Sequence, residues 1–195
     1  ARRYHASASS KITGIFGGGQ APSTTATIDA ISIASTGNAT DFGDLTRQKR
    51  GTAGLSNNTR GICVGGNISP TATGYSEIEF ITINSLGNAS AFGDASADHS
   101  YAMTNASTTR GIIALSNSPY ASPYPGVNTI EYITISTEGN AKDFGDLTEP
   151  RGDFSGTISS QTRGCFAGGY FPPNSSTEIV DSSSYWVPLF RPRRR

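Results

Sequence analysis

Three copies of one short motif contain the residues that look most suited to chemistry. The segments NATDFGDLT at 38–46 and NAKDFGDLT at 140–148 are nearly identical, and NASAFGDAS at 88–96 is a diverged copy. In protein kinases the D-F-G aspartate binds magnesium, and it acts with a glycine-rich phosphate loop, a lysine and an H-R-D motif. The sequence lacks that set of partners. We therefore interpret the repeated phenylalanine as a packing residue, the glycine as a turn residue, and the aspartates as partners of turn amides or arginines.

Other side chains that could catalyse a reaction or bind a metal are few. The two histidines, His5 and His99, do not occupy equivalent positions in the repeat described below. Cys63 and Cys165 fall one place apart on equivalent predicted strands, so we expect them to point to opposite faces and to form no disulfide. A metal site needs several ligands that converge on one point. The sequence therefore predicts no catalytic residue, no metal site and no cofactor.

Two further motifs are interpreted as incidental. RGD at 151–153 has the sequence of the integrin-binding tripeptide, but it falls at the junction of two repeat units. RPRRR at 191–195 could meet phosphate or an anionic surface, but a basic run this short is more often a solvated terminus.

Composition narrows the fold class and the partners. The formal net charge is zero and 15% of the residues are charged, which disfavours nucleic acid as a partner. No apolar run approaches the length of a membrane span, so we expect no membrane insertion. Glycine, serine, threonine and asparagine are abundant, as in short strands joined by turns. Two cysteines cannot form a disulfide framework.

Four sequence blocks recur in one order with a period near 50 residues. The first block contains the anchor glycines, which are separated by 47, 50 and 53 residues. The anchor glycines are Gly14, Gly61, Gly111 and Gly164. An alternating stretch precedes each of them, a strand rich in β-branched residues follows, and a G-N-A…F-G-D block closes the first three units. We place the units at about 1–46, 47–96, 97–148 and 149–183, and a C-terminal strand with a basic tail at 184–195.

Each unit has the pattern of four short strands, and no window shows helical periodicity. The third strand is TIDAISI at 27–33, EIEFITI at 77–83 and TIEYITI at 129–135. Alternation in the last copy puts Ile133 on one face and Ile130 on the other, so we expect both faces to be covered. The sequence therefore predicts an all-β chain.

This order of blocks resembles the kelch repeat, whose units of about 50 residues are the four-stranded blades of a β-propeller. In that family a glycine doublet ends the second strand, and a tryptophan usually occupies the later aromatic position. The positions that carry the resemblance are the doublets Gly17-Gly18, Gly65-Gly66 and Gly168-Gly169 and the aromatic residues Phe42, Phe92 and Phe144. Arg60, Arg110 and Arg163 recur directly before three of the anchor glycines and are structural residues of the repeat.

The sequence departs from the kelch pattern at two places. Leu115-Ser116 replaces the doublet in the third unit, and the last unit lacks the G-N-A and F-G-D blocks. Its outer strand could come from SYWVPLF at 184–190. The resemblance covers about residues 2–180 and implies a propeller of four blade-like units, either closed by themselves or part of a larger ring.

The loops after the second strands differ most between units and are the predicted recognition site. They vary in length and contain many of the prolines and tyrosines, and such loops carry function on rigid scaffolds. The candidate ligand-binding residues are Tyr75, Tyr120, Tyr124, Tyr170 and Phe171. The alternative, that these rings only cover the edges of the units, stays open.

The repeats combine TRGI at 59–62 and 109–112, NTIEYITISTEGNAKDFGDLT at 128–148 and a glycine doublet in a chain of low charge. In this combination they also resemble repeats in structural and tail-fibre proteins of bacteriophages, notably those of marine bacteria. That resemblance implies a non-enzymatic protein of the virion surface or tail, outside the cell, whose loops bind a host-surface glycan or protein or another virion protein, with a homo-oligomer as one option. The first alternative is a kelch-type scaffold that binds a protein partner. The second is an enzyme similar to galactose oxidase, which would need copper.

Overall fold

Short strands form all the regular structure of the described residues. The computed structural model describes residues 1–68, 74–116, 127–170 and 184–188, which contain fourteen strands and no helix. Unit 1 consists of β1 (Ala6–Ser9), β2 (Thr13–Gly17), β3 (Thr27–Ser32) and β4 (Thr40–Asp44). Unit 2 consists of β5 (Ala53–Ser56), β6 (Arg60–Val64), β7 (Tyr75–Thr82) and β8 (Ser90–His99).

The remaining strands form units 3 and 4. Unit 3 consists of β9 (Met103–Ala106), β10 (Arg110–Ala114), β11 (Val127–Thr134) and the first part of β12 (Lys142–Ser159). Unit 4 consists of the rest of β12, β13 (Arg163–Tyr170) and β14 (Ser184–Pro188). The all-β prediction is confirmed for the described residues, and the expected third strands at 27–33 and 129–135 are β3 and β11.

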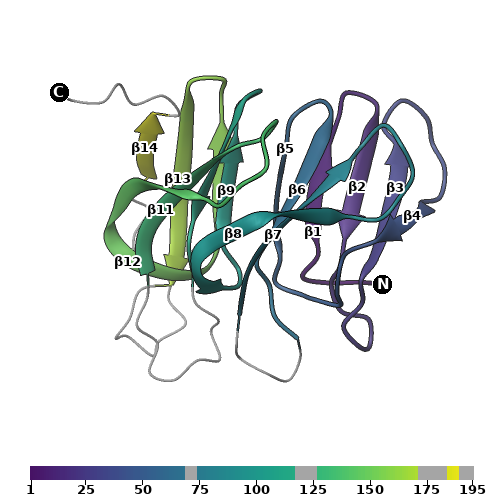
Figure 1. The fold of residues 1–195 in the computed structure, drawn as a ribbon, viewed down its shortest axis with the longest axis horizontal. Coiled ribbons are helices and arrows are strands. Elements are labelled where there is room, and N and C mark those ends of the chain that lie inside the picture. Colours follow the sequence, from purple (N-terminus) through teal and green to yellow (C-terminus); the bar gives the residue numbers. More distant parts are fainter. Residues whose placement is uncertain (69–73, 117–126, 171–183, 189–195) are drawn as a thin grey trace.

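Each unit is an antiparallel sheet whose strands are hydrogen-bonded in chain order. Units 1 and 2 are separate four-stranded sheets, whereas β12 belongs to units 3 and 4 and joins their sheets. The units follow one another across the molecule, from purple unit 1 on one side to green and yellow unit 4 on the other (Figure 1). The first strand of each unit contacts the first strand of the next, as between β1 and β5 or β5 and β9.

The hydrophobic core lies between consecutive units. We call the face of a unit that packs on the following unit its forward face, and the opposite face its backward face. Ile15 and Phe42 on the forward face of unit 1 pack with Cys63 and Ile81 on the backward face of unit 2. Equivalent clusters lie between units 2 and 3 and between units 3 and 4. Burial of this apolar surface is what holds the sheets together, because no single sheet has a core of its own.

The third strands confirm that both faces of a unit are covered. On β11, Ile133 is 2% exposed and packs toward unit 2, whereas Ile130 is 2% exposed and packs toward unit 4. The two residues lie on opposite faces because side chains alternate along a strand.

Unit 4 differs from the unit expected from sequence. Residues Ser184–Pro188 form β14, which pairs with β13 and therefore occupies the place of a third strand. The option that the segment from Ser184 supplies an outer, fourth strand is therefore wrong for the described part of the chain. A truncated copy of the third-strand block, TEIVDSS at 177–183, lies outside the described residues. The tripeptide at 151–153 lies within β12, where Gly152 pairs with Tyr170.

Candidate functional site

The repeated F-G-D block of one unit is hydrogen-bonded to the G-N-A turn of the next. The amide of Gly87 donates to the carbonyl of Phe42 at 3.0 Å, and the amide of Ala89 donates to the carbonyl of Asp44 at 2.8 Å. The side-chain oxygen of Asn88 accepts from the amide of Asp44 at 3.0 Å. All three residues of the turn thus bind the F-G-D strand of the preceding unit. We call this arrangement the G-N-A/F-G-D contact.

The same three bonds recur between units 2 and 3. Gly139 donates to Phe92 and Ala141 donates to Asp94, both at 2.8 Å. Asn140 accepts from the amide of Asp94 at 3.1 Å. The two blocks are therefore repeated together because each is the partner of the other in the neighbouring unit.

The F-G-D glycine allows this close approach. A methyl group added at Gly43 would lie 2.5 Å from the carbonyl oxygen of Gly87, and one added at Gly93 would contact the carbonyl of Gly139. Both glycines also have positive φ values, 148° and 157°. The expectation of a turn at this glycine is wrong: Gly43 and Gly93 lie inside the strands β4 and β8, each beside a β-bulge. Both the positive φ and the neighbouring backbone require glycine there.

The F-G-D phenylalanines are packing residues, but not equally. Phe42 is 6% exposed and Phe92 is 4% exposed, and each belongs to the cluster between its own unit and the next. Phe144 is only half-buried at the edge of the third cluster, so the expectation that all three are largely buried is wrong for this residue. The difference follows from position, because the unit after Phe144 has no G-N-A block.

A buried acid–base pair links units 1 and 2. The ammonium group of Lys49, whose side chain is fully buried, lies 2.9 Å from a carboxylate oxygen of Glu79, whose side chain is 2% exposed. The other carboxylate oxygen accepts from the amide of Thr46 at 2.9 Å and from the Thr46 hydroxyl. Glu79 on β7 thus holds the segment that leads from β4 to β5. A buried pair of this kind needs both partners, because an unpaired charge in such surroundings is strongly unfavourable.

The equivalent positions in unit 3 are His99 and Glu131. The carboxylate of Glu131 accepts from the amide of Ser96 at 3.1 Å and 3.3 Å, as Glu79 does from Thr46. Burial lowers the pKa of His99, while the carbonyl of Ala97, 3.0 Å from Nδ1, and the nearby Glu131 partly oppose that shift. His99 is therefore neutral near pH 7, and its second ring nitrogen is buried without a hydrogen-bond partner among the described residues.

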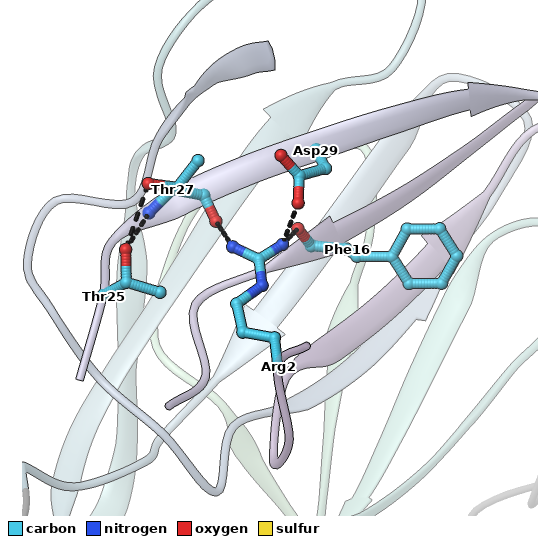
Figure 2. Close-up of polar contacts among 5 residues, drawn as sticks. All are labelled: Arg2, Phe16, Thr25, Thr27 and Asp29. Carbon is cyan, nitrogen blue, oxygen red and sulfur yellow. Dashed lines mark hydrogen bonds and ion pairs between the residues drawn. The ribbon is translucent and has the colours of Figure 1, made fainter. Parts of the chain in front are cut away.

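Unit 1 has the corresponding pair Arg2 and Asp29 (Figure 2). The guanidinium group of Arg2 contacts Asp29 at 2.5 Å and donates to the backbone carbonyls of Thr27 at 2.8 Å and Phe16 at 3.2 Å. In this unit the acid is shorter and the pair is partly exposed. Each of the first three units thus has a basic or imidazole residue four places before its first strand, facing an acid on its third strand.

These acid–base positions were missed in the sequence because each looks like an isolated charge. Aligning the first strands would have revealed them, since Arg2, Lys49 and His99 each lie four residues before the start of β1, β5 or β9.

The chemistry of the cysteines is suppressed by burial. Cys63 lies beside the Lys49–Glu79 pair, and desolvation raises its pKa to about 12, so the thiol stays protonated and is a poor nucleophile. Cys63 and Cys165 are both free and buried. No group of three or more metal-ligating side chains occurs among the residues that the structure describes.

The arginines after the first turn stack on aromatic rings. The guanidinium of Arg60 lies 4.4 Å from the ring centre of Phe80, whose ring meets Phe92 edge-on. Arg110 lies 4.5 Å from the ring centre of Tyr132 in the same way. The acid that pairs with Arg60 is Glu138, at 3.2 Å, so the expectation that an F-G-D aspartate pairs with this arginine is wrong.

Unit 1 lacks that stack and has a hollow in its place. Thr13 and Ala30 occupy the positions of Arg60 and Phe80, and a hollow of about 770 Å³ opens between the units 1 and 2. Phe42, Ile31, Ile83 and other apolar side chains line it together with hydroxyl and amide side chains, and none of its lining residues is charged. The hollow has the size and chemistry to take a neutral polar group.

The glycine doublet of unit 1 is Gly18-Gly19 and not Gly17-Gly18 as predicted from the sequence. Gly17 pairs with Ala6 and Ile28 as an ordinary residue of β2, whereas Gly18 and Gly19 have the positive φ values, 68° and 103°, of Gly65 and Gly66, 59° and 110°. The doublet was assigned as Gly17-Gly18 because three consecutive glycines obscure the register. The backbone of Gly168 pairs with Ser155 on β12.

Two of the five predicted recognition residues, Tyr75 and Tyr170, lie within the described residues. Tyr120, Tyr124 and Phe171 lie outside the described residues. Tyr75 and Tyr170 were placed in loops, but Tyr75 is the first residue of β7 and Tyr170 is the last residue of β13.

Tyr75 is in addition partly buried, because the guanidinium of Arg47 lies 4.8 Å from its ring centre. Its strand position comes from pairing with His99 across β7 and β8. Tyr75 therefore belongs to the framework from which the second loop projects.

Comparison with known proteins assigns no family. No family model matches the sequence, and no curated protein matches it. Among the described residues no helix is long and apolar enough to cross a membrane.

Proposed function

We propose that the chain is a non-enzymatic recognition scaffold: its four units are blades of a kelch-like β-propeller that display the loops after their second strands to a ligand. The supporting observation is that the side chains most suited to catalysis are buried between the units. Lys49, Glu79 and Cys63 are buried between units 1 and 2, and His99 and Glu131 occupy the equivalent place before unit 3. These groups stabilise the packing of the units and are closed to a substrate.

The arrangement of the second and third strands supports display of the loops. The units repeat in the same orientation, so the end of β6 and the start of β7 lie at the same end of the molecule as the end of β10 and the start of β11 (Figure 1). Loops that leave a rigid framework at one end can together form one binding surface.

The ligand we propose is a host-surface glycan or protein, and the location is the surface or tail of a virion outside the cell. This part of the proposal depends on the resemblance of the repeats to phage structural proteins. A neutral chain favours binding by ring stacking and hydroxyl hydrogen bonds over binding by charge. A kelch-type scaffold for a protein partner inside a cell is the alternative.

Replacement of Tyr120 and Tyr124 by alanine tests the function. We expect at least a tenfold loss of attachment to host cells or to an immobilised glycan, with no change in melting temperature. The matched control is Tyr75→Phe, which keeps the ring under Arg47 and should attach normally. Undiminished attachment of the Tyr120/Tyr124 variant would remove this site.

A further inference from the structure

Among the described residues, the backward face of unit 1 is left uncovered, whereas those of units 2, 3 and 4 pack against the preceding unit. Ile33 is 53% exposed, whereas the equivalent residues Ile83 and Ile135 are 2% and 0% exposed between units. Ile12, whose carbonyl accepts a hydrogen bond from the amide of Ile33, is 62% exposed. Contiguous exposed apolar side chains of this sort mark an interaction surface.

Two more positions on this face show the same contrast. Phe16 is half-buried, and its equivalents Cys63, Ile113 and Phe166 are at most 2% exposed. Ile31 is also half-buried, and its equivalents Ile81 and Ile133 are 1% and 2% exposed. The backward faces of units 2, 3 and 4 thus show how far these positions are buried when a preceding unit covers them.

The boundaries between units also show which side chain covers the backward face. At each boundary between units, a side chain from the first strand of one unit lies over the anchor glycine of the next. A methyl group added at Gly61 would lie 3.2 Å from Ala8, and one added at Gly111 would lie 2.8 Å from Leu55. The first anchor glycine, Gly14, would meet only Ile31 and Ile33 of its own unit.

The chain carries the matching side chain at its other end. Asn105 lies over Gly164 in the third pair, and the next member of the first-strand series is Ile158 on β12. Ile158 is 69% exposed, although its equivalent Leu55 is 5% exposed. One chain therefore has one uncovered glycine position, on unit 1, and one uncovered first-strand side chain, on unit 4.

Hydrogen bonds between first strands point to the same partner. The hydroxyl of Ser56 donates to the carbonyl of Ser9 at 2.9 Å, and the hydroxyl of Ser159 donates to the carbonyl of Ala106 at 3.2 Å. Each bond runs from a unit to the one before it. In unit 1 the equivalent hydroxyl, on Ser9, is on the exposed backward side and would reach the first strand of a preceding unit.

We propose that a second copy of this chain covers the backward face of unit 1, with Ile158 of that copy over Gly14. The contact continues the interface that already recurs three times within the chain. Two chains joined in this way at both ends have eight units, which is within the range of about four to eight blades known for propellers. A head-to-tail interface of this kind closes when the rotation between copies completes a ring.

Within one chain, unit 4 does not cover the exposed backward face of unit 1 in this structure. Gly14 and Ile33 of unit 1 and Thr157 and Ser159 of unit 4 line one hollow of about 520 Å³, together with residues of the first strands of units 1, 2 and 3. Ile33 and Ile158 keep more than half of their surface exposed. A second copy can cover both positions, because it carries the complementary face at each of its own ends.

The first test is the mass in solution as a function of concentration. We expect twice the chain mass of 20.3 kDa for the unsubstituted protein and the single-chain mass for Ile33→Glu. The control is Thr137→Glu, because Thr137 is exposed in the turn between β11 and β12 of unit 3 and should leave the dimer intact. A monomer for the unsubstituted protein at all concentrations overturns the proposal.

The second test identifies the partner and does not depend on a charged variant being folded. Chains with Ile33→Cys are mixed with chains with Ile158→Cys and treated with a short bismaleimide; the unsubstituted protein, whose two cysteines are buried, is the control. A cross-link between the two kinds of chain supports the proposal. Cross-linking of Ile33→Cys chains to each other, or a cross-link within one chain carrying both substitutions and none in the mixture, overturns it.

Discussion

The G-N-A/F-G-D contact predicts that Gly93→Ala is strongly destabilising although alanine adds a single methyl group. That methyl would contact the carbonyl oxygen of Gly139 and lie 2.8 Å from the amide nitrogen of Asn140. Both are backbone atoms, so rotation of a side chain cannot relieve the contact, and the strand and the turn must separate. Separation weakens the bonds from Gly139 and Ala141 and the one to Asn140.

Overpacking of a tight contact costs about 1–3 kcal/mol, and each net hydrogen bond contributes about 1 kcal/mol. We therefore expect Gly93→Ala to lower the free energy of unfolding by about 3 kcal/mol. In a chain of this size that loss corresponds to a fall in melting temperature of about 6–12 °C. Thermal unfolding followed by circular dichroism measures it directly.

The matched control is Gly145→Ala. Gly145 is the third F-G-D glycine and has a positive φ of 139°, but an added methyl group meets no atom within 4 Å. The strain of placing alanine at such a φ is common to both variants, so their difference measures the contact with the next unit. If Gly93→Ala is no more destabilising than Gly145→Ala, the structural role assigned to the repeated block is wrong.

Three further predictions concern the packing between units. Phe92→Ala should lower the free energy of unfolding by about 3–5 kcal/mol and Phe144→Ala by clearly less, because Phe144 is half-buried; equal urea midpoints would contradict this. Glu79→Gln should cost about 3–5 kcal/mol by leaving Lys49 unpaired, and a double-mutant cycle with Lys49→Met should show coupling. His99 should make stability fall as the pH drops below about 6.5, since the unfolded imidazole then takes up a proton that the buried one resists, and His99→Gln should flatten that fall in melting temperature.

The sequence predicted the repeat and the strands because both depend on local patterns. Alternation in the third strands located β3, β7 and β11, and it assigned Ile130 and Ile133 to opposite faces. The recurrence of Phe42 and Phe92 also indicated packing residues. These features are properties of short segments that reappear at a constant period.

The contacts between units could not be predicted because they join residues about 45 positions apart. The role of Gly43 depends on the carbonyl of Gly87, and the role of Glu79 depends on Thr46 and Lys49. Within one segment each of these residues resembles an ordinary turn glycine or surface charge. Only the stacking of one sheet on the next gives them their partners.

Hydrogen exchange at the backbone of the turns tests most directly whether the repeated blocks join one unit to the next. The structure predicts slow exchange for the amides of Gly87, Ala89, Gly139 and Ala141, all of which donate to the preceding unit. It predicts fast exchange in the equivalent turn of unit 1, at 37–39, where none of the amides donates to a backbone carbonyl among the described residues. Equal, fast exchange in all three turns would contradict the account.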